Sequence, residues 1–194
     1  MHRRHLLALG LAAIATPSLA APRPYALAPG QATITYTFTL NGNPVKGTVP
    51  LNRADLTIDP ANLAASTADV TADIRRARTG LLFATEALKS ASVLNANGFP
   101  LARFKSTRVI LGPGGRISDG AKLEGNLTLR GVTRPVRFDA NLFRARGSTT
   151  DNLDALTVTL SGRINRRDYG AIGYPDLVAD TVGIDIQAEI SATG

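Results

Sequence analysis

The chain has 194 residues, of which 44% are hydrophobic, and it carries 22 Lys and Arg against 15 Asp and Glu, with no Cys and no Trp. Its two histidines and its one methionine all lie within the first five residues, so the rest of the chain contains no His, Cys or Met. This composition excludes Ser-His and Cys-His nucleophile pairs, thiolate or imidazole zinc sites and haem ligation by His, Met or Cys. Any catalysis would depend on carboxylates, Lys or Tyr.

The first 20 residues have the pattern of a secretory signal peptide. Arg3 and Arg4 form a basic start, residues 6–15 are apolar, and Ser18-Leu19-Ala20 is a small-residue cleavage signal. Cleavage after Ala20 is the first choice and after Ala21 the second, and the arginine pair also resembles a twin-arginine signal, so both export routes stay open. We therefore expect a periplasmic or secreted protein with a single domain over residues 21–194.

Removal of residues 1–20 leaves 20 basic against 15 acidic residues, a net charge of +5. A moderately basic exported protein suits an anionic lipid headgroup or transient contact with a negatively charged membrane surface. Scattered, solvated arginines explain the same charge equally well. Nucleic acid is not expected as a partner, because aromatic residues are few and no nucleic-acid motif is present. Without Cys, no disulfide can hold the domain, so a hydrophobic interior must do so.

Hydrophobic periodicity predicts a series of β-strands interrupted once by a helical segment. The cleanest alternation places Ile34, Tyr36, Phe38 and Leu40 on one face of a strand. A run of helix-favouring residues follows Gly80, and no alternation is seen there. In chain order, the predicted elements are a loose leader over 21–30, strands over 33–40, 45–51, 55–59 and 65–74, one or two short helices within 81–96, and strands over 99–110, 122–130, 133–143, 156–164 and 182–190.

About eight antiparallel strands, each with one apolar face, must either pack as two sheets or close into a barrel. A barrel of this size has an interior just wide enough to be filled by side chains or to hold one slender ligand. The strand pattern is the same in both cases, so the residues by themselves favour the simpler interpretation of a filled core.

Several motifs resemble the YceI-like family in their order along the chain. The hairpin GNLTLRGVTRPVRFDA at 125–140 is followed by INRRDYG at 164–170, and FPLARFKS at 99–106 and VADTVGI at 178–184 fit other strands of that family. The chain differs from many members at Phe38-Thr39-Leu40-Asn41, where they carry a His, and in the more apolar helix around Glu86. The resemblance implies an all-β, antiparallel lipocalin-like barrel with a short helical insert, and a polyisoprenoid or other long-chain lipid inside it.

The resemblance also implies candidate binding residues, although each of them could equally be a core residue that contacts only protein. Lipid contacts require apolar area with little directionality, so no cofactor or metal is expected. The candidates for the wall of the tube are Tyr36, Phe38, Phe104, Leu127, Phe138, Leu160 and Ile184. The candidates for its mouth or lid are Leu81, Leu82, Phe83 and Leu88.

Two groups of arginines lie at predicted strand ends, where they could meet a phosphate or carboxylate at the barrel mouth. Arg75 represents the first group and Arg166 the second, but solvated strand ends are the simpler explanation for both. The following Asp168-Tyr169-Gly170 is interpreted as a structural turn. Asn126 matches a glycosylation pattern but lies within a predicted strand, so we discount it.

Three functional hypotheses remain open at this point. The first is an exported, non-enzymatic protein, monomeric or homodimeric, that carries or sequesters a lipid. The second is a periplasmic, stress-related structural module with a filled core. The third is a lipid-acting hydrolase that uses Asp168 or Asp180, although no paired-carboxylate motif supports it. A hollow interior would separate the first hypothesis from the second.

Overall fold

The computed structural model describes residues 21–193 except 116, 118–119, 146 and 150–151, so the predicted signal segment over 1–20 lies outside the described residues. Short 3₁₀ helices at Leu63–Ala65, Ile74–Arg76 and Arg166–Tyr169 connect some of the strands. The strands and the helix are, in chain order, β1 Arg23–Leu40, β2 Asn43–Ile58, β3 Thr67–Asp73, β4 Arg78–Thr79, α1 Leu82–Lys89, β5 Leu101–Ile110, β6 Ala121–Leu129, β7 Val132–Arg144, β8 Ala155–Asn165 and β9 Thr181–Ala192.

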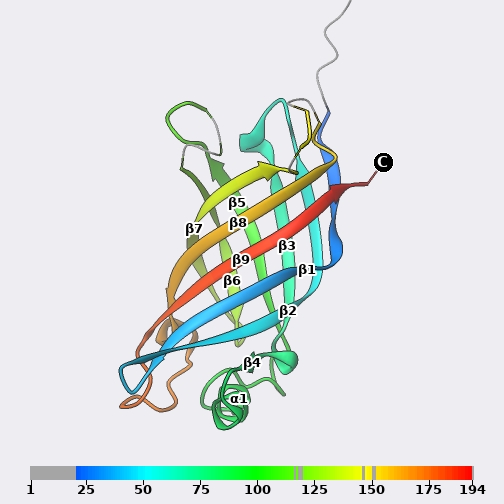
Figure 1. The fold of residues 1–194 in the computed structure, drawn as a ribbon. Helices are drawn as coiled ribbons and strands as arrows, with labels where there is room; N and C mark the ends of the chain where they lie inside the picture. The colour runs from blue at the N-terminus through cyan, green and yellow to red at the C-terminus, as the bar shows by residue number, and fades with distance from the viewer. Residues whose placement is uncertain (1–20, 116, 118–119, 146, 150–151, 194) are drawn as a thin grey trace, which may run out of the picture.

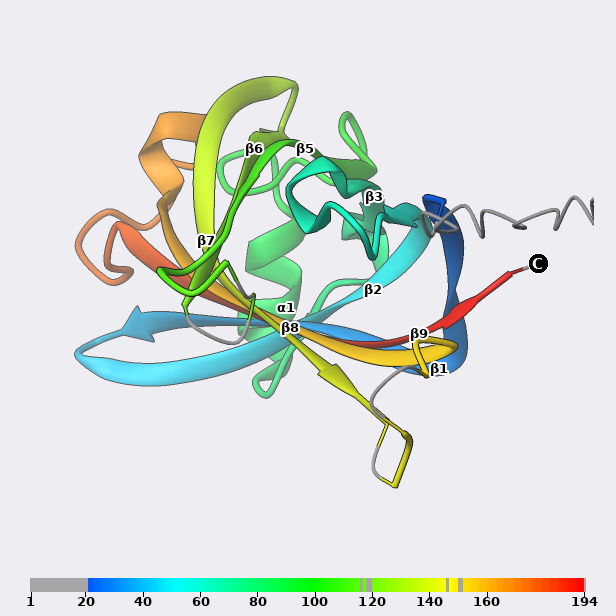
Figure 2. The same ribbon diagram turned by 90° about the horizontal axis from the view of Figure 1, so that it is seen from above.

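Eight of these strands form a closed antiparallel barrel. Their hydrogen-bonded order is β1-β9-β8-β7-β6-β5-β3-β2, and the pairing of β1 with β2 closes the ring (Figures 1 and 2). The two-residue strand β4 pairs with β2 outside this ring and leads into α1, which lies at one end of the barrel. Closure satisfies the backbone groups that open sheet edges would leave unpaired. The predicted lipocalin-like barrel with a short helical insert is confirmed.

The predicted loose leader over 21–30 is wrong, because β1 begins at Arg23. In this first part of the strand, Tyr25 pairs with Leu56 of β2 and with Ala192 of β9. The Tyr25 side chain is buried, and its hydroxyl donates a hydrogen bond to the Leu153 carbonyl at 2.7 Å. The prolines of this segment predict that no strand forms there. The strand forms because β2 and β9 pair with it, and the local sequence does not show this pairing.

Two predicted strands, over 45–51 and 55–59, are one continuous strand, β2. The polar residues Asn52 and Arg53 interrupt the alternation that predicted the strands, and the pairing of β2 with β3 shifts register between Leu51 and Arg53. Such a bulge adds a residue and bends the strand without ending it. The predicted helical region over 81–96 is likewise shorter than expected. Helix α1 ends at Lys89, and turns follow it as far as residue 98.

The hairpin of β6 and β7 forms as predicted, with a tight two-residue turn. Arg130 and Gly131 both have positive φ, 52° and 75°, as a twist-matched hairpin turn requires. The Arg130 guanidinium donates hydrogen bonds to the carbonyls of Ala91 and Val93 at 2.8 and 2.6 Å. These bonds tie the turn to the segment that follows α1. Asn126 is exposed within β6, in agreement with its interpretation as a strand residue.

Three glycines of the barrel wall lie beneath aromatic rings of neighbouring strands. A Cβ atom added to Gly47 would come within 2.2 Å of the Tyr36 ring, one on Gly125 within 2.5 Å of Phe104, and one on Gly162 within 2.6 Å of Phe138. Each ring therefore lies close against the wall at a point where the next strand has no side chain. This arrangement keeps large aromatic residues from occupying the centre of the barrel.

Gly47→Ala is therefore expected to lower the free energy of unfolding by about 1–3 kcal/mol, because the new methyl group would displace the Tyr36 ring and the Arg78 carbonyl. Gly183→Ala is the matched control in another strand, since its Cβ would lie 3.8 Å from the nearest atoms, those of Thr37. Urea unfolding measures the stability of both variants, and a shift of the midpoint with an unchanged m-value reports a change in the free energy of unfolding. Equal midpoints for the two variants would show that Tyr36 does not depend on the glycine.

Candidate functional site

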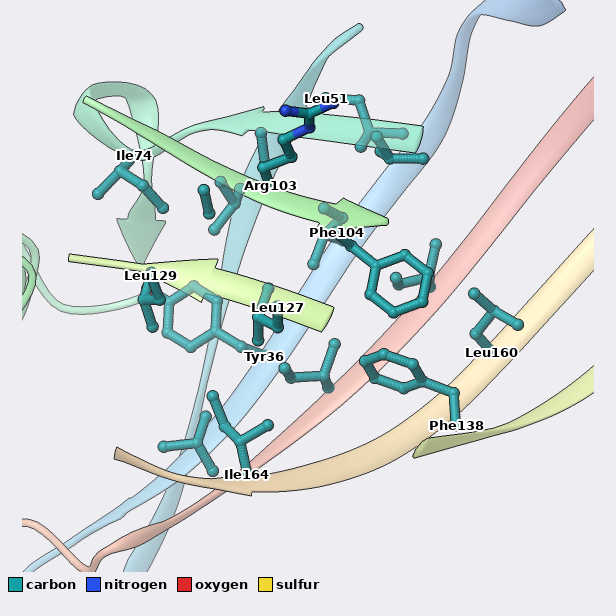
Figure 3. Close-up of a pocket in the computed structure, with 18 of the residues that line it drawn as sticks. Tyr36, Leu51, Ile74, Arg103, Phe104, Leu127, Leu129, Phe138, Leu160 and Ile164 are labelled. Carbon is teal, nitrogen blue, oxygen red and sulfur yellow. The ribbon is translucent and has the colours of Figure 1, made fainter. Parts of the chain in front are cut away.

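The barrel encloses a cavity of about 990 Å³, lined by residues of all eight barrel strands and of α1. Pockets for small ligands are usually about 300–1,000 Å³, so this cavity lies at the upper end of that range. Figure 3 shows side chains from different strands, among them Tyr36, Phe104, Phe138 and Leu160, that point into one shared space. Inward-facing positions of eight strands thus surround a hollow centre.

The distribution of burial agrees with a hollow interior. The buried residues form two separate clusters, whereas a filled domain usually has one contiguous core. One cluster includes Tyr36 and Ile74, near α1, and the other includes Tyr25 and Ile190, at the opposite end. Inward-facing residues such as Leu160 are only partly buried, because open space lies in front of them. The barrel is therefore closed at its wall and unfilled along part of its axis.

The aromatic side chains present ring surfaces to the cavity. The rings of Phe104 and Phe138 meet edge to face, with centroids 5.6 Å apart and planes at 77°. Tyr36 and Phe38 are stacked with centroids 6.1 Å apart. The Tyr36 hydroxyl donates to the Arg78 carbonyl at 2.9 Å, and burial strongly raises its pKa. This hydroxyl is neutral and already partnered, so Tyr36 offers the cavity an apolar surface.

Nearly all of the predicted binding residues line the cavity. The one that does not is Leu82, whose side chain is 76% exposed on the outer side of α1. The ten that do are Tyr36, Phe38, Leu81, Phe83, Leu88, Phe104, Leu127, Phe138, Leu160 and Ile184. The structure thus brings the predicted wall and most of the predicted mouth to one space.

The mouth of the cavity can be located by the large hydrophobic residues that both line it and are exposed at the surface. On the α1 side these are Leu81 and Phe83, and on the other side Tyr174 and Leu177. The second pair is not predicted from the sequence, because the segment over 171–178 has no strand or helix periodicity. Its unusual apolar content, AIGYPDLV, is the signal that could have indicated it.

Backbone hydrogen bonds hold the 171–178 segment beside α1 and the first hairpin. The Gly173 amide donates to the Ser92 carbonyl at 2.8 Å, and the Asn41 amide donates to the Leu177 carbonyl at 2.8 Å. Gly170, with φ of 71°, begins this segment after the 3₁₀ helix that contains the buried Tyr169. The structural interpretation of Asp168-Tyr169-Gly170 agrees with this geometry.

The headgroup hypothesis for Arg166 needs correction, because its guanidinium is already used by the protein. The side chain is buried, and it donates hydrogen bonds of 2.6–3.1 Å to four backbone carbonyls. Those carbonyls belong to Ala171, Gly173, Val178 and Ala179. The guanidinium also pairs with Asp180 at 3.5 Å. Arg166 therefore borders the cavity as the anchor of the 171–178 segment, and its donors are directed at protein groups.

Arg75 is also placed away from the cavity. Its exposed side chain pairs with Asp73 at 3.3 Å and does not line the hollow interior. The side-chain hydrogen bond from Arg75 holds the pKa of the Asp73 carboxyl below its usual value. The headgroup role predicted for Arg75 thus has no geometric support.

Acidic groups are scarce at the cavity. Within the described residues, Glu86 of α1 is the one carboxylate that lines it, and Glu86 pairs with Lys89 at 3.5 Å. Asp168 and Asp180, considered for a hydrolase, do not line it, and Asp180 accepts a hydrogen bond from Arg167 at 2.6 Å. Paired carboxylates suited to acid and base chemistry are therefore not assembled at this part of the structure. No helix among the described residues has the length and apolar character needed to cross a membrane.

A closed eight-stranded barrel with an apolar cavity and a helix at its mouth defines a lipocalin-like β-barrel protein. The sequence profile of the YceI-like domain matches residues 25–190. The chain belongs to the YceI-like family.

Similar proteins cover nearly the whole chain. A UPF0312 protein of Vibrio cholerae serotype O1 is 28% identical over 193 residues, which is 94% of this chain and 98% of the relative. Among solved structures, BcnA of Burkholderia cenocepacia is similar with a TM-score of 0.70 and 19% identity, over 82% of this chain and 96% of BcnA. A polyisoprenoid binding domain from Saccharophagus degradans, implicated in plant cell wall breakdown, has a TM-score of 0.59 and 12% identity, over 88% and 99% of the two chains.

Proposed function

We propose that this protein is an exported, non-enzymatic carrier that holds a polyisoprenoid or another long-chain lipid inside its barrel. The observation that carries the proposal is the cavity of about 990 Å³ enclosed by apolar side chains from every barrel strand. An apolar chain placed there gains roughly 25 cal/mol for each Å² removed from water, with few directional contacts. The similarity in fold to a polyisoprenoid binding domain supports this class of ligand.

The polar groups at the cavity are few, and their positions suit binding better than catalysis. Asn141 and Thr57 contribute polar atoms among many aliphatic and aromatic residues, and Glu86 is the one acidic lining residue in the described structure. Export is supported by the signal-like residues 1–20.

The direct test is mass spectrometry of an organic extract from protein purified out of its native host. We expect about one long-chain lipid per protein molecule, given one cavity of this size. Protein stripped of lipid should be stabilised by added polyprenol, by about 2.7 kcal/mol when the free ligand reaches a hundred times its Kd. An extract without lipid, together with unchanged stability after addition of polyprenol and of fatty acid, would contradict the proposal and favour a structural module.

A further inference from the structure

The exposed apolar residues of the protein gather at one end of the barrel. The described part of the chain leaves nine large hydrophobic residues exposed. Eight of them belong to the start of α1, to the start of β5 or to the 171–178 segment, which lie at the α1 end, whereas Phe143 is next to the last residue of β7. Phe83 is 91% exposed, Leu82 76% and Ile172 59%. Single exposed hydrophobic residues are ordinary, but a concentration of them around one opening is typical of an interaction surface.

This apolar surface is continuous with the mouth of the cavity. Phe83 and Tyr174 are exposed at the surface and also line the cavity, while their neighbours Leu82 and Ile172 are exposed without lining it. The Gly173 amide donates to the Ser92 carbonyl, so the 171–178 segment lies directly beside the segment that follows α1. A partner that covers this surface would therefore cover the opening through which a lipid enters.

The same end carries an excess of positive charge. Residues 73–89, together with the β2 residue Lys46 beside them, contain five cations and two carboxylates, and the 171–178 segment adds one carboxylate. The two carboxylates within residues 73–89 already pair with a cation, Asp73 with Arg75 and Glu86 with Lys89. Lys46, Arg76 and Arg78 are exposed and have no carboxylate partner among the ion pairs of the described residues.

Lys46 and Arg78 share the outer face of the barrel next to α1. Lys46 and Thr48 flank Gly47 on β2, so their side chains lie on the face opposite to the one where Gly47 meets the Tyr36 ring. Arg78 pairs with Thr48 and therefore shares this outer face with Lys46. Cations placed next to exposed hydrophobic residues match the two layers of a bilayer surface, where anionic headgroups lie just above acyl chains.

We propose that the α1 end of the barrel docks on an anionic lipid bilayer, with Leu82, Phe83 and Ile172 inserted among the headgroups and Lys46, Arg76 and Arg78 against them. The inference rests on the proposed lipid-carrier function and adds the surface from which the lipid is taken or to which it is delivered. Docking in this orientation places the cavity mouth on the membrane, so the lipid passes between bilayer and cavity with little exposure of its apolar chain to water.

Vesicle flotation of the chain from Ala21 onward, which contains the entire barrel, tests the proposal. We expect the protein to float with vesicles of phosphatidylglycerol and phosphatidylcholine, to bind phosphatidylcholine alone more weakly, and to be released by salt. Binding to neither kind of vesicle would overturn the proposal and leave a protein partner as the occupant of this surface.

Matched substitutions separate docking from the filling of the cavity. Leu82→Ser with Ile172→Ser should weaken vesicle binding by about tenfold or more, because both side chains are exposed and their apolar area no longer enters the interface. Phe143→Ser, at an exposed residue of the other end, should leave binding unchanged. Likewise, Arg78→Glu should weaken binding to anionic vesicles at least fivefold, since one cation near such a surface contributes about that factor, and Arg144→Glu at the opposite end should not.

The lipid content of the same variants distinguishes failure of docking from failure of the proposed function. Leu82 and Ile172 do not line the cavity, so added polyprenol should stabilise the lipid-free double variant as much as it stabilises the lipid-free unaltered protein. Vesicle binding by that variant at the strength of the unaltered protein would overturn the docking inference, whatever the cavity contains. Absence of lipid from every variant and from the unaltered protein would instead count against the carrier function.

Discussion

Substitution of Leu127 and Leu160 by tryptophan is expected to exclude lipid from the barrel without unfolding it. The two residues lie on β6 and β8, and both side chains point into the cavity (Figure 3). An indole is much larger than the side chain of leucine, so two of them would occupy space that an acyl or isoprenoid chain needs. We expect the extractable lipid to fall by about tenfold or more, since apolar contact area supplies most of the binding free energy.

The stability of this double variant is the informative part of the measurement. In a filled core, added volume costs about 1–3 kcal/mol per site, whereas a hollow interior can accept it. We therefore expect a free energy of unfolding within about 1 kcal/mol of that of the unaltered, lipid-free protein. Asn126→Trp with Ser161→Trp is the matched control, because these are the adjacent exposed residues on the same two strands. A loss of several kcal/mol in the inward variant alone would mean that the centre is packed with protein.

Arg166→Met should cause the largest loss of stability, about 3–5 kcal/mol in the free energy of unfolding. Methionine is an unbranched apolar side chain, shorter than arginine and without donors, so four backbone carbonyls would lose the hydrogen bonds that Arg166 now donates at 2.6–3.1 Å. The side chain is only 5% exposed, so water cannot readily replace those bonds. The 171–178 segment at the mouth should exchange its amide hydrogens faster for the same reason.

Arg167→Met is the neighbouring control for this prediction. The Arg167 side chain is 46% exposed and pairs with Asp180 at 2.6 Å, and exposed ion pairs contribute only about 0–1 kcal/mol. Arg166→Lys should recover part of the stability, because an ammonium group has three donors in place of five. Urea unfolding of the three variants provides the comparison. Equal losses for Arg166→Met and Arg167→Met would refute the anchoring role.

Both corrections to the strand boundaries have the same physical origin. The prolines before Gly30 and the polar pair Asn52-Arg53 interrupt the alternation of apolar and polar residues. A strand predicted from that alternation therefore ends where the alternation stops. In the structure, β1 and β2 continue through these places because neighbouring strands supply backbone partners and a bulge absorbs the extra residue. Local sequence does not contain those partners.

The two predicted headgroup arginines illustrate a similar difficulty within the site. Arg166 and Arg75 were identified as cations near strand ends, and that position is correct. Whether each guanidinium is free to bind a ligand depends on the carbonyls and carboxylates that lie next to it in the folded protein. For Arg166 these are carbonyls of residues 171–179, which stand up to 13 positions further along the chain. The cavity-lining residues were easier to predict, because alternation along a strand assigns its inner face directly.

The sequence by itself determined the all-β class, the single helical insert, the family and the inner face of most of the strands, because strand alternation and ordered motifs are local properties of the chain. Only the tertiary structure decided that the barrel is hollow, that the 171–178 segment forms half of its mouth, and that Arg166 anchors this segment. These features depend on how much space remains between strands that are distant in sequence, and on which backbone groups meet there. A filled and an unfilled barrel have the same alternation, so only the packing of the closed ring distinguishes them.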